Sequence, residues 1–208
     1  MYSRKHYLKV LNEAQERISY LGLGTRARVC GFQVKDTDSG EEIKFYNFGC
    51  EYKIIDGGKR IVNGNGREMP LLMRVITMHH LIEAKPTPIT GALAPIRSFP
   101  GLESYEATIR RRTEEILLRA FGNSPELLMA SAERLGGVAV KMGDSAARIY
   151  PLPRLPIVIV INKSGEGLPA GAALLYDRSA SELLPLEDIV VLAELVSRKI
   201  VNIAKQRT

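Results

Sequence analysis

The sequence is poor in the residues that most often build metal centres. Its 208 residues include two cysteines, three histidines and no tryptophan. The thiol and imidazole candidates are Cys30, Cys50, His6, His79 and His80. None has a ligand spacing such as C-x-x-C or H-x-x-x-H, and adjacent helical side chains such as His79 and His80 point about 100° apart. We therefore predict no metal site and no cofactor, and no iron–sulfur cluster, which usually needs about four thiolates.

Long hydrophobic runs are also absent. The longest apolar runs fall far short of the ~20 residues that a membrane helix needs. The residues after Met1 lack the apolar core of a signal peptide. With 45% apolar and 25% charged residues, the chain has the composition of an ordinary globular protein. We expect a cytoplasmic protein without membrane contact, and two reduced, buried thiols, with a cross-strand cysteine pair as the alternative.

No concentration of charge of one sign stands out. The formal charge of +6 arises from 15 basic and 11 acidic residues through Ser104 and 14 and 12 after it. A charge spread in this way is weak evidence for a dedicated anionic ligand and argues against a nucleic-acid partner. The basic residues near the C-terminus and the triple arginine Arg110 to Arg112 are expected to be solvated. The length suits one domain, residues 1–208.

The stretch from Pro151 to Val201 organises the predicted fold. The apolar run Ile157 to Ile161 is typical of a strand buried on both faces. After a glycine-rich turn, Ala172 to Tyr176 is predicted to be its antiparallel neighbour. Beyond Pro185, apolar residues recur every three or four positions, which predicts a long amphipathic helix lying on this hairpin.

The rest of the chain predicts a meander of strands followed mainly by helices. The expected strands are 26–34, 43–48, 51–55, 59–62, 138–142 and 145–150. The expected helices begin near Ser3, Pro70, Glu103 and Ser124, and 85–101 is expected to be a proline-rich loop. These elements indicate an α+β fold, with antiparallel sheets from an N-terminal meander and a C-terminal hairpin covered by about five helices.

The order of motifs resembles an uncharacterised family, the domain of unknown function 3786. The resemblance rests on Pro153-Arg-Leu-Pro-Ile157, Leu174-Leu-Tyr-Asp-Arg-Ser-Ala-Ser181, Leu183-Leu-Pro-Leu-Glu-Asp-Ile189, Phe99-Pro-Gly-Leu-Glu-Ser-Tyr105, Leu135-Gly-Gly137 and Gly143-Asp144. The resemblance implies an origin in anaerobic bacteria or archaea and a partner that is an iron–sulfur or corrinoid protein, since some similar proteins are fused to an iron–sulfur domain. It implies no activity. The family usually has an acidic turn between the two inner strands, and this chain keeps only Glu166 of it.

The candidate site combines Arg154, before the inner strand, with Asp177, after its neighbour. If these strand ends lie side by side, a guanidinium and a carboxylate can form a bidentate pair. We favour a structural clamp. The alternative is an anion or small-ligand pocket, with Arg154 contacting the anion and Tyr105 and Tyr176 as walls. Asp144 is a further weak candidate.

His79 and His80 are the remaining candidates, on the predicted helix after Pro70. We favour packing for His79 over a ligand or acid–base role. Two functional hypotheses follow. The first is a non-enzymatic binding or accessory protein that works beside anaerobic redox or one-carbon proteins. The second is a small enzyme for a phosphorylated, nucleotide or corrinoid ligand, using Arg154, Asp177 and a histidine.

Overall fold

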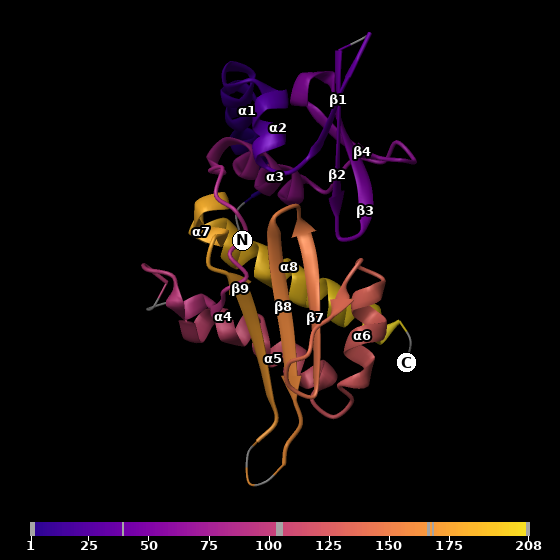
Figure 1. Ribbon diagram of the computed structural model, residues 1–208, viewed down its shortest axis with the longest axis vertical. Coiled ribbons are helices and arrows are strands. Elements are labelled where there is room, and N and C mark those ends of the chain that lie inside the picture. Colours follow the sequence, from indigo (N-terminus) through magenta and orange to yellow (C-terminus); the bar gives the residue numbers. More distant parts are fainter. Residues whose placement is uncertain (1–2, 39, 103–105, 166, 168, 207–208) are drawn as a thin grey trace.

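A computed structural model describes residues 3–38, 40–102, 106–165, 167 and 169–206. Its N-terminal part, α1 to α3, contains an antiparallel sheet in chain order, and its C-terminal part, β5 to α8, contains a second sheet (Figure 1). The elements of the N-terminal part are α1 (Arg4–Leu21), α2 (Leu23–Val29), β1 (Gln33–Thr37), β2 (Gly40–Asn47), β3 (Cys50–Ile55), β4 (Arg60–Asn63) and α3 (Leu71–Glu83). The α+β class and the meander are confirmed.

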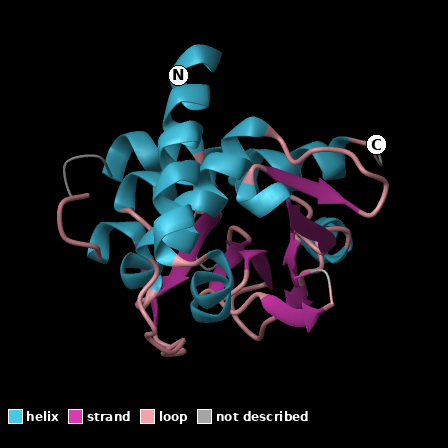
Figure 2. Ribbon diagram, turned by 90° about the horizontal axis from the view of Figure 1, so that it is seen from above, coloured by secondary structure: helices cyan, strands magenta, loops and turns pink. Residues whose placement is uncertain are grey.

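The C-terminal sheet has the strand order β5-β9-β8-β7-β6, and every pairing is antiparallel. Its strands are β5 (Leu93–Pro95), β6 (Val138–Ala139), β7 (Ser145–Leu152), β8 (Leu155–Asn162) and β9 (Gly171–Asp177). Its helices are α4 (Glu106–Arg112), α5 (Glu114–Phe121), α6 (Glu126–Glu133), α7 (Ala180–Leu183) and α8 (Leu186–Lys205). In the view from above, most helices of the molecule lie toward the top and left, and most strands lie toward the centre and right (Figure 2).

Strand β8 lies at the centre of the core, as its apolar run predicts. Ile157, Ile159 and Ile161 pack into the cluster that also contains the buried face of α8. Val158 and Val160 point to the other face, where a smaller apolar cluster buries them. Residues 157 to 161 are all buried, so the prediction of a strand buried on both faces is confirmed.

The predicted strand 26–34 is wrong in its first half, because residues 23–29 form α2. The Arg26 side chain is held at the end of α3, where it donates hydrogen bonds to the carbonyls of Leu81, Ile82 and Ala84. Those carbonyls have no partner inside α3, since the last turn of a helix leaves its carbonyls free. This tertiary contact overrides the alternating pattern that indicates a strand.

The helix predicted to begin near Glu103 is two helices, and the first of them, α4, ends at Arg112. Thr113 interrupts the helix with φ −124° and ψ −76°, and it is almost fully buried. Its hydroxyl donates to the Ile109 carbonyl over 2.8 Å. Threonine hydroxyls that bond the preceding turn compete with the regular helical geometry. Two further elements depart from the prediction. Strand β5 lies inside the expected proline-rich loop, and the sequence pattern does not indicate the short helix α7.

The two cysteines are free thiols in different surroundings. Cys30 is buried and its thiol donates to the His80 carbonyl over 3.2 Å. Burial raises the pKa of Cys30 to about 12, so this thiol stays protonated. Cys50 is exposed at the first position of β3, so the predicted burial is wrong for Cys50.

The two parts meet where β2 approaches β7. The Asn47 side chain donates to the Pro151 carbonyl across this junction. Nearby, Gly49 and Gly136 come so close that a Cβ on Gly49 would lie 2.8 Å from the Gly136 nitrogen. Gly49 also has φ +75°, a conformation that L side chains rarely adopt. The junction therefore needs glycine at this position.

Candidate functional site

Arg154 and Asp177 do not form the predicted pair. The strand ends do lie side by side, since Tyr176 is opposite Ile157 in the β8–β9 register. Arg154, however, occupies the β7–β8 turn with φ +64°, and its guanidinium donates to the carbonyls of Val29 and Thr87. In the described part of the chain, no ion pair joins Arg154 to Asp177. The left-handed turn directs the guanidinium toward α2 and away from the end of β9.

Asp177 is instead an acceptor for the loop before β5. The residue is 1% exposed, and its carboxylate accepts hydrogen bonds from the Thr90 nitrogen and hydroxyl and from the Gly91 nitrogen, at 2.6 to 3.0 Å. The Ser179 nitrogen and hydroxyl donate to the same carboxylate. Burial raises the pKa of Asp177, but the hydrogen bonds from Ser179 and Thr90 outweigh it and lower the pKa to about 2.

The long proline-rich loop is therefore the element that Arg154 and Asp177 share. Arg154 holds it at Thr87, and Asp177 holds it at Thr90 and Gly91. The structure places both residues in a clamp whose two halves act through the loop backbone. Together the two side chains bind seven donor or acceptor groups, four of them in the loop, and these groups would otherwise need water.

His79 and His80 face different partners. His79 Nδ1 lies 2.6 Å from Asp188 Oδ2 at the start of α8, and the hydrogen bond raises the pKa of His79 although burial lowers it. His80 is fully buried and Nδ1 donates to the Leu183 carbonyl over 2.9 Å. Burial lowers the pKa of His80 to about 4, so it is neutral at physiological pH.

Asp144 and Tyr105 do not extend the Arg154 site. The Asp144 carboxylate accepts a hydrogen bond from the Lys163 nitrogen over 2.6 Å, at the opposite end of β8 from Arg154. Its own nitrogen donates to the Ile161 carbonyl. Tyr105 lies outside the described residues.

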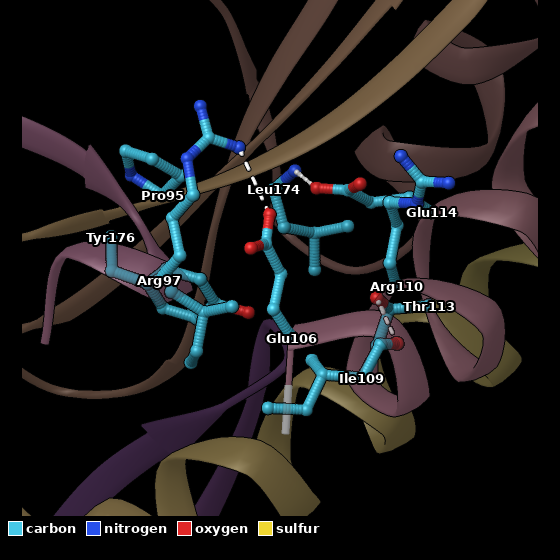
Figure 3. A pocket seen from close by; sticks show the side chains of 10 residues that line it. Pro95, Arg97, Glu106, Ile109, Arg110, Thr113, Glu114, Leu174 and Tyr176 are labelled. Carbon is cyan, nitrogen blue, oxygen red and sulfur yellow. Dashed lines mark hydrogen bonds and ion pairs between the residues drawn. The ribbon is translucent and has the colours of Figure 1, made fainter. Parts of the chain in front are cut away.

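Tyr176 lines a small polar pocket between α4, α5 and β9 (Figure 3). Tyr176 is 2% exposed, and its ring packs edge-on against Phe99. Among the described residues, its hydroxyl has no hydrogen-bond partner. Glu114 stands across the pocket and accepts a long hydrogen bond of 3.4 Å from the Leu174 nitrogen, and burial raises the pKa of Glu114.

This pocket is too small for a substrate. Its volume is about 10 Å³, which is room for about one water molecule. Arg97 and Glu106 form an exposed ion pair of 3.4 Å at its entrance. A buried phenol beside a half-buried carboxyl can bind a water or the terminal oxygen of a larger ligand, but the pocket shows no room for more.

A larger hollow surface follows α8, and the sequence analysis did not identify it. Three adjoining hollows of about 830, 440 and 270 Å³ share Arg198 in their linings. We call their combined lining the α8 groove. It consists of Tyr7, Asn47, Phe48, Tyr52, Pro70, Leu72, Met73, Arg112, Ile116, Arg119, Ala120, Val191, Glu194, Leu195, Arg198, Lys199, Val201, Asn202 and Lys205.

The α8 groove combines cations with apolar side chains. Five cations against Glu194 give its lining a net charge of +4. The Glu194 carboxylate lies 3.1 Å from an Arg112 nitrogen and 4.0 Å from an Arg198 nitrogen. Lys199 lies 5.1 Å from the centre of the Phe48 ring, within cation–π distance. No local motif could reveal this site, because five helices (α1, α3, α4, α5 and α8) and the β2–β3 hairpin contribute to it.

The described residues offer no evident metal centre and no membrane span. In that part of the chain, no group of three or more His, Cys, Asp or Glu side chains is placed to hold a metal ion. None of its helices is both long and apolar enough to cross a membrane.

The fold and the groove define an α+β protein with a cationic, partly apolar surface cleft. The chain matches the family described as a domain of unknown function (DUF3786) over residues 23–199, and it belongs to that family. The resemblance seen in the sequence motifs is thereby confirmed as to family, while an anaerobic origin stays a prediction. No curated protein and no solved structure gives a match.

Proposed function

We propose that this protein is a non-enzymatic binding or accessory protein and that the α8 groove is its partner-binding surface. The observation that carries the proposal is the groove itself, in which three hollows meet at Arg198 between the N-terminal and C-terminal parts. Binding sites occur preferentially where two structural units meet. The groove also has the partly apolar floor and charged rim of a protein-binding surface.

The side chains that the sequence suggested for chemistry make structural contacts, and this supports a binding function over an enzymatic one. Arg154, Asp177 and His80 are engaged with backbone groups, and His79 is paired with Asp188. None of these four side chains lines the α8 groove or the Tyr176 pocket. Their contacts hold elements together, so they favour structural roles.

We further propose a cytoplasmic location and a partner from anaerobic redox or one-carbon systems, namely an iron–sulfur or corrinoid protein. The support for this partner class is the resemblance set out in the sequence analysis. The groove adds that such a partner would carry acidic and apolar groups on its contact surface.

The competing hypothesis is a small enzyme for a phosphorylated, nucleotide or corrinoid ligand. One observation favours it, the unpartnered Tyr176 hydroxyl facing the half-buried Glu114. A ligand would then have to widen the pocket between α4 and β9. Co-crystallisation with such a ligand tests this, since density in the Tyr176 pocket would support the enzyme and contradict our choice.

Site-specific photo-crosslinking tests the binding function. A photoreactive amino acid replaces Leu195 in the groove or, as a matched control, exposed Lys141 on the β6–β7 loop, and the full chain is incubated with lysate of anaerobic cells. We expect a discrete adduct at position 195 that is absent at 141 and lost in the Arg198→Glu background. An absence of any groove-dependent adduct contradicts the binding function. An adduct with a protein outside the redox and one-carbon systems contradicts the partner class alone.

A further inference from the structure

The α8 groove is long enough to receive several turns of a partner helix. Along α8, its lining residues Val191, Leu195, Arg198, Asn202 and Lys205 recur every three or four positions, so they form one stripe. Fourteen residues separate the first from the last, which corresponds to about 21 Å at 1.5 Å per residue. In Figure 1, α8 passes between the N-terminal part and the α4–α5 pair, and residues of both, such as Leu72 and Ile116, line the hollows beside the stripe.

The floor of the groove is apolar at its widest end. Leu72, Val191 and Leu195 are half-buried against the core and line the largest hollow. Val191 and Leu195 are four residues apart, so they lie one above the other on α8. Such a floor accepts the apolar side chains of a helix at positions i and i+4, the usual anchors of helix-in-groove recognition.

The cations stand along the rim of this floor. Arg112 and Arg119 come from the α4–α5 side, and Arg198, Lys199 and Lys205 come from α8. The Arg198 side chain is 65% exposed and the Arg112 side chain 55% exposed, so both guanidinium groups are accessible. A partner with acidic residues beside its apolar stripe would meet these cations on binding.

Glu194 distinguishes a protein partner from a nucleic acid. Its carboxylate lies within the groove, between Arg112 and Arg198, and 20% of the side chain is exposed. A phosphate backbone has a charge at every nucleotide, so one running along this groove would pass the carboxylate and be repelled. A helix can place an uncharged residue opposite Glu194.

We infer that the occupant of the α8 groove is an acidic amphipathic helix of a partner protein, with an apolar stripe facing Val191 and Leu195 and carboxylates facing the rim cations. This inference rests on the proposed function and specifies its partner. A second copy of this chain and a nucleic acid are the occupants that the test must separate from it.

The test is fluorescence anisotropy with the full-length chain and a labelled synthetic helix of about 14 residues, the length of the groove. The probe has leucines on one face and glutamates beside them. A second peptide has the same composition, scrambled so that no apolar face forms. The other probes are a charge-swapped peptide, with lysine for glutamate, and a single-stranded oligonucleotide. Sedimentation of the protein alone tests self-association.

We expect the amphipathic acidic peptide to bind at least about tenfold more tightly than the scrambled and charge-swapped peptides. Arg198→Glu should weaken binding by about tenfold or more and Leu195→Gln by several-fold, whereas Lys141→Glu should stay within about twofold. Circular dichroism and melting temperature check that each variant is folded. Added salt should reduce the effect of Arg198→Glu on binding more than the effect of Leu195→Gln, because salt screens charges. That difference would further support the inference.

Equal binding of the scrambled peptide would overturn the inference, because it would show attraction by charge alone. Tighter binding of the oligonucleotide would assign the groove to nucleic acid, and dimerisation that Arg198→Glu abolishes would assign it to a second copy. If crosslinking finds a groove-dependent partner but the peptide does not bind, only the claim that the partner binds through a helix is refuted. The absence of both would refute the binding function as well.

Discussion

His79 Nδ1 lies 2.6 Å from Asp188 Oδ2, and this hydrogen bond joins α3 in the N-terminal part to the first turn of α8. The His79 side chain is 26% exposed and that of Asp188 15% exposed, so the contact is partly shielded from water. Arg17 and Glu83 form a neighbouring ion pair of 3.0 Å. Its carboxylate raises the pKa of His79, and its guanidinium lowers it. The Asp188 carboxylate stabilises the protonated imidazole and thereby links the pairing of the two parts to pH.

We predict that this contact weakens as the pH rises. Because the folded pKa of His79 is raised above its unfolded value of about 6.5, its contribution is fully present below that pH and is lost as the pH passes the folded pKa. His79→Gln should destabilise the protein by about 1 kcal/mol at pH 5.5 and by less at pH 8.5. Urea denaturation at both values, with Asp188→Asn as the second variant of a double-mutant cycle, measures this. A difference independent of pH would contradict the prediction.

Asp177→Ala should be one of the most destabilising single substitutions outside the apolar core. It removes an acceptor of hydrogen bonds from Thr90, Gly91 and Ser179 in a nearly fully buried position. We expect a loss of about 3 kcal/mol in the free energy of unfolding at pH 7. Exposed Asp144→Ala is the control and should cost less than about 1 kcal/mol.

The same carboxylate predicts a loss of stability in acid. With a folded pKa of about 2, below the usual value for aspartate, Asp177 stabilises the fold above its unfolded pKa. That contribution disappears as the pH falls from about 4 toward 2. The difference between wild type and Asp177→Asn, measured by thermal unfolding, should therefore shrink over this range. A constant difference would show that the carboxylate charge is not responsible.

Arg154→Ala should destabilise the fold more than it alters any binding. The guanidinium holds the Val29 carbonyl and the Thr87 carbonyl together, so its removal should cost about 2 kcal/mol and release the proline-rich loop. Melting temperature and limited proteolysis near residues 85–92 measure both effects. Arg154→Lys should restore little, since an ammonium group cannot reproduce the planar fork. Equal melting temperatures for wild type and Arg154→Ala would refute the clamp.

Gly49→Ala should weaken the junction between the two parts. The added Cβ would lie 2.8 Å from the Gly136 backbone, and the residue has a positive φ. We expect a loss of more than about 1 kcal/mol, measured by urea denaturation. Gly64→Ala is the matched control, because a Cβ there meets nothing within 4 Å.

Local patterns in the chain were sufficient for most of the strands and for most of the helices. The run Ile157 to Ile161 and the spacing of apolar residues from Ile189 onward identify their elements because burial on both faces or along one stripe leaves a direct pattern in the sequence. The patterns failed where a distant contact outweighs local preference. Arg26 at the end of α3 and Thr113 in the helix break are two such places.

The sequence by itself determined the family, the α+β class and the central β8–β9 pair, since these depend on periodicity and on motifs that lie close together in the chain. Only the tertiary structure decided what the polar residues do. It turned Arg154 and Asp177 toward one loop instead of toward each other, and it gathered Leu72, Arg112 and Arg198 into one groove. The physical reason is that a side chain's partner depends on turn geometry and helix packing across long sequence separations, which no local pattern specifies.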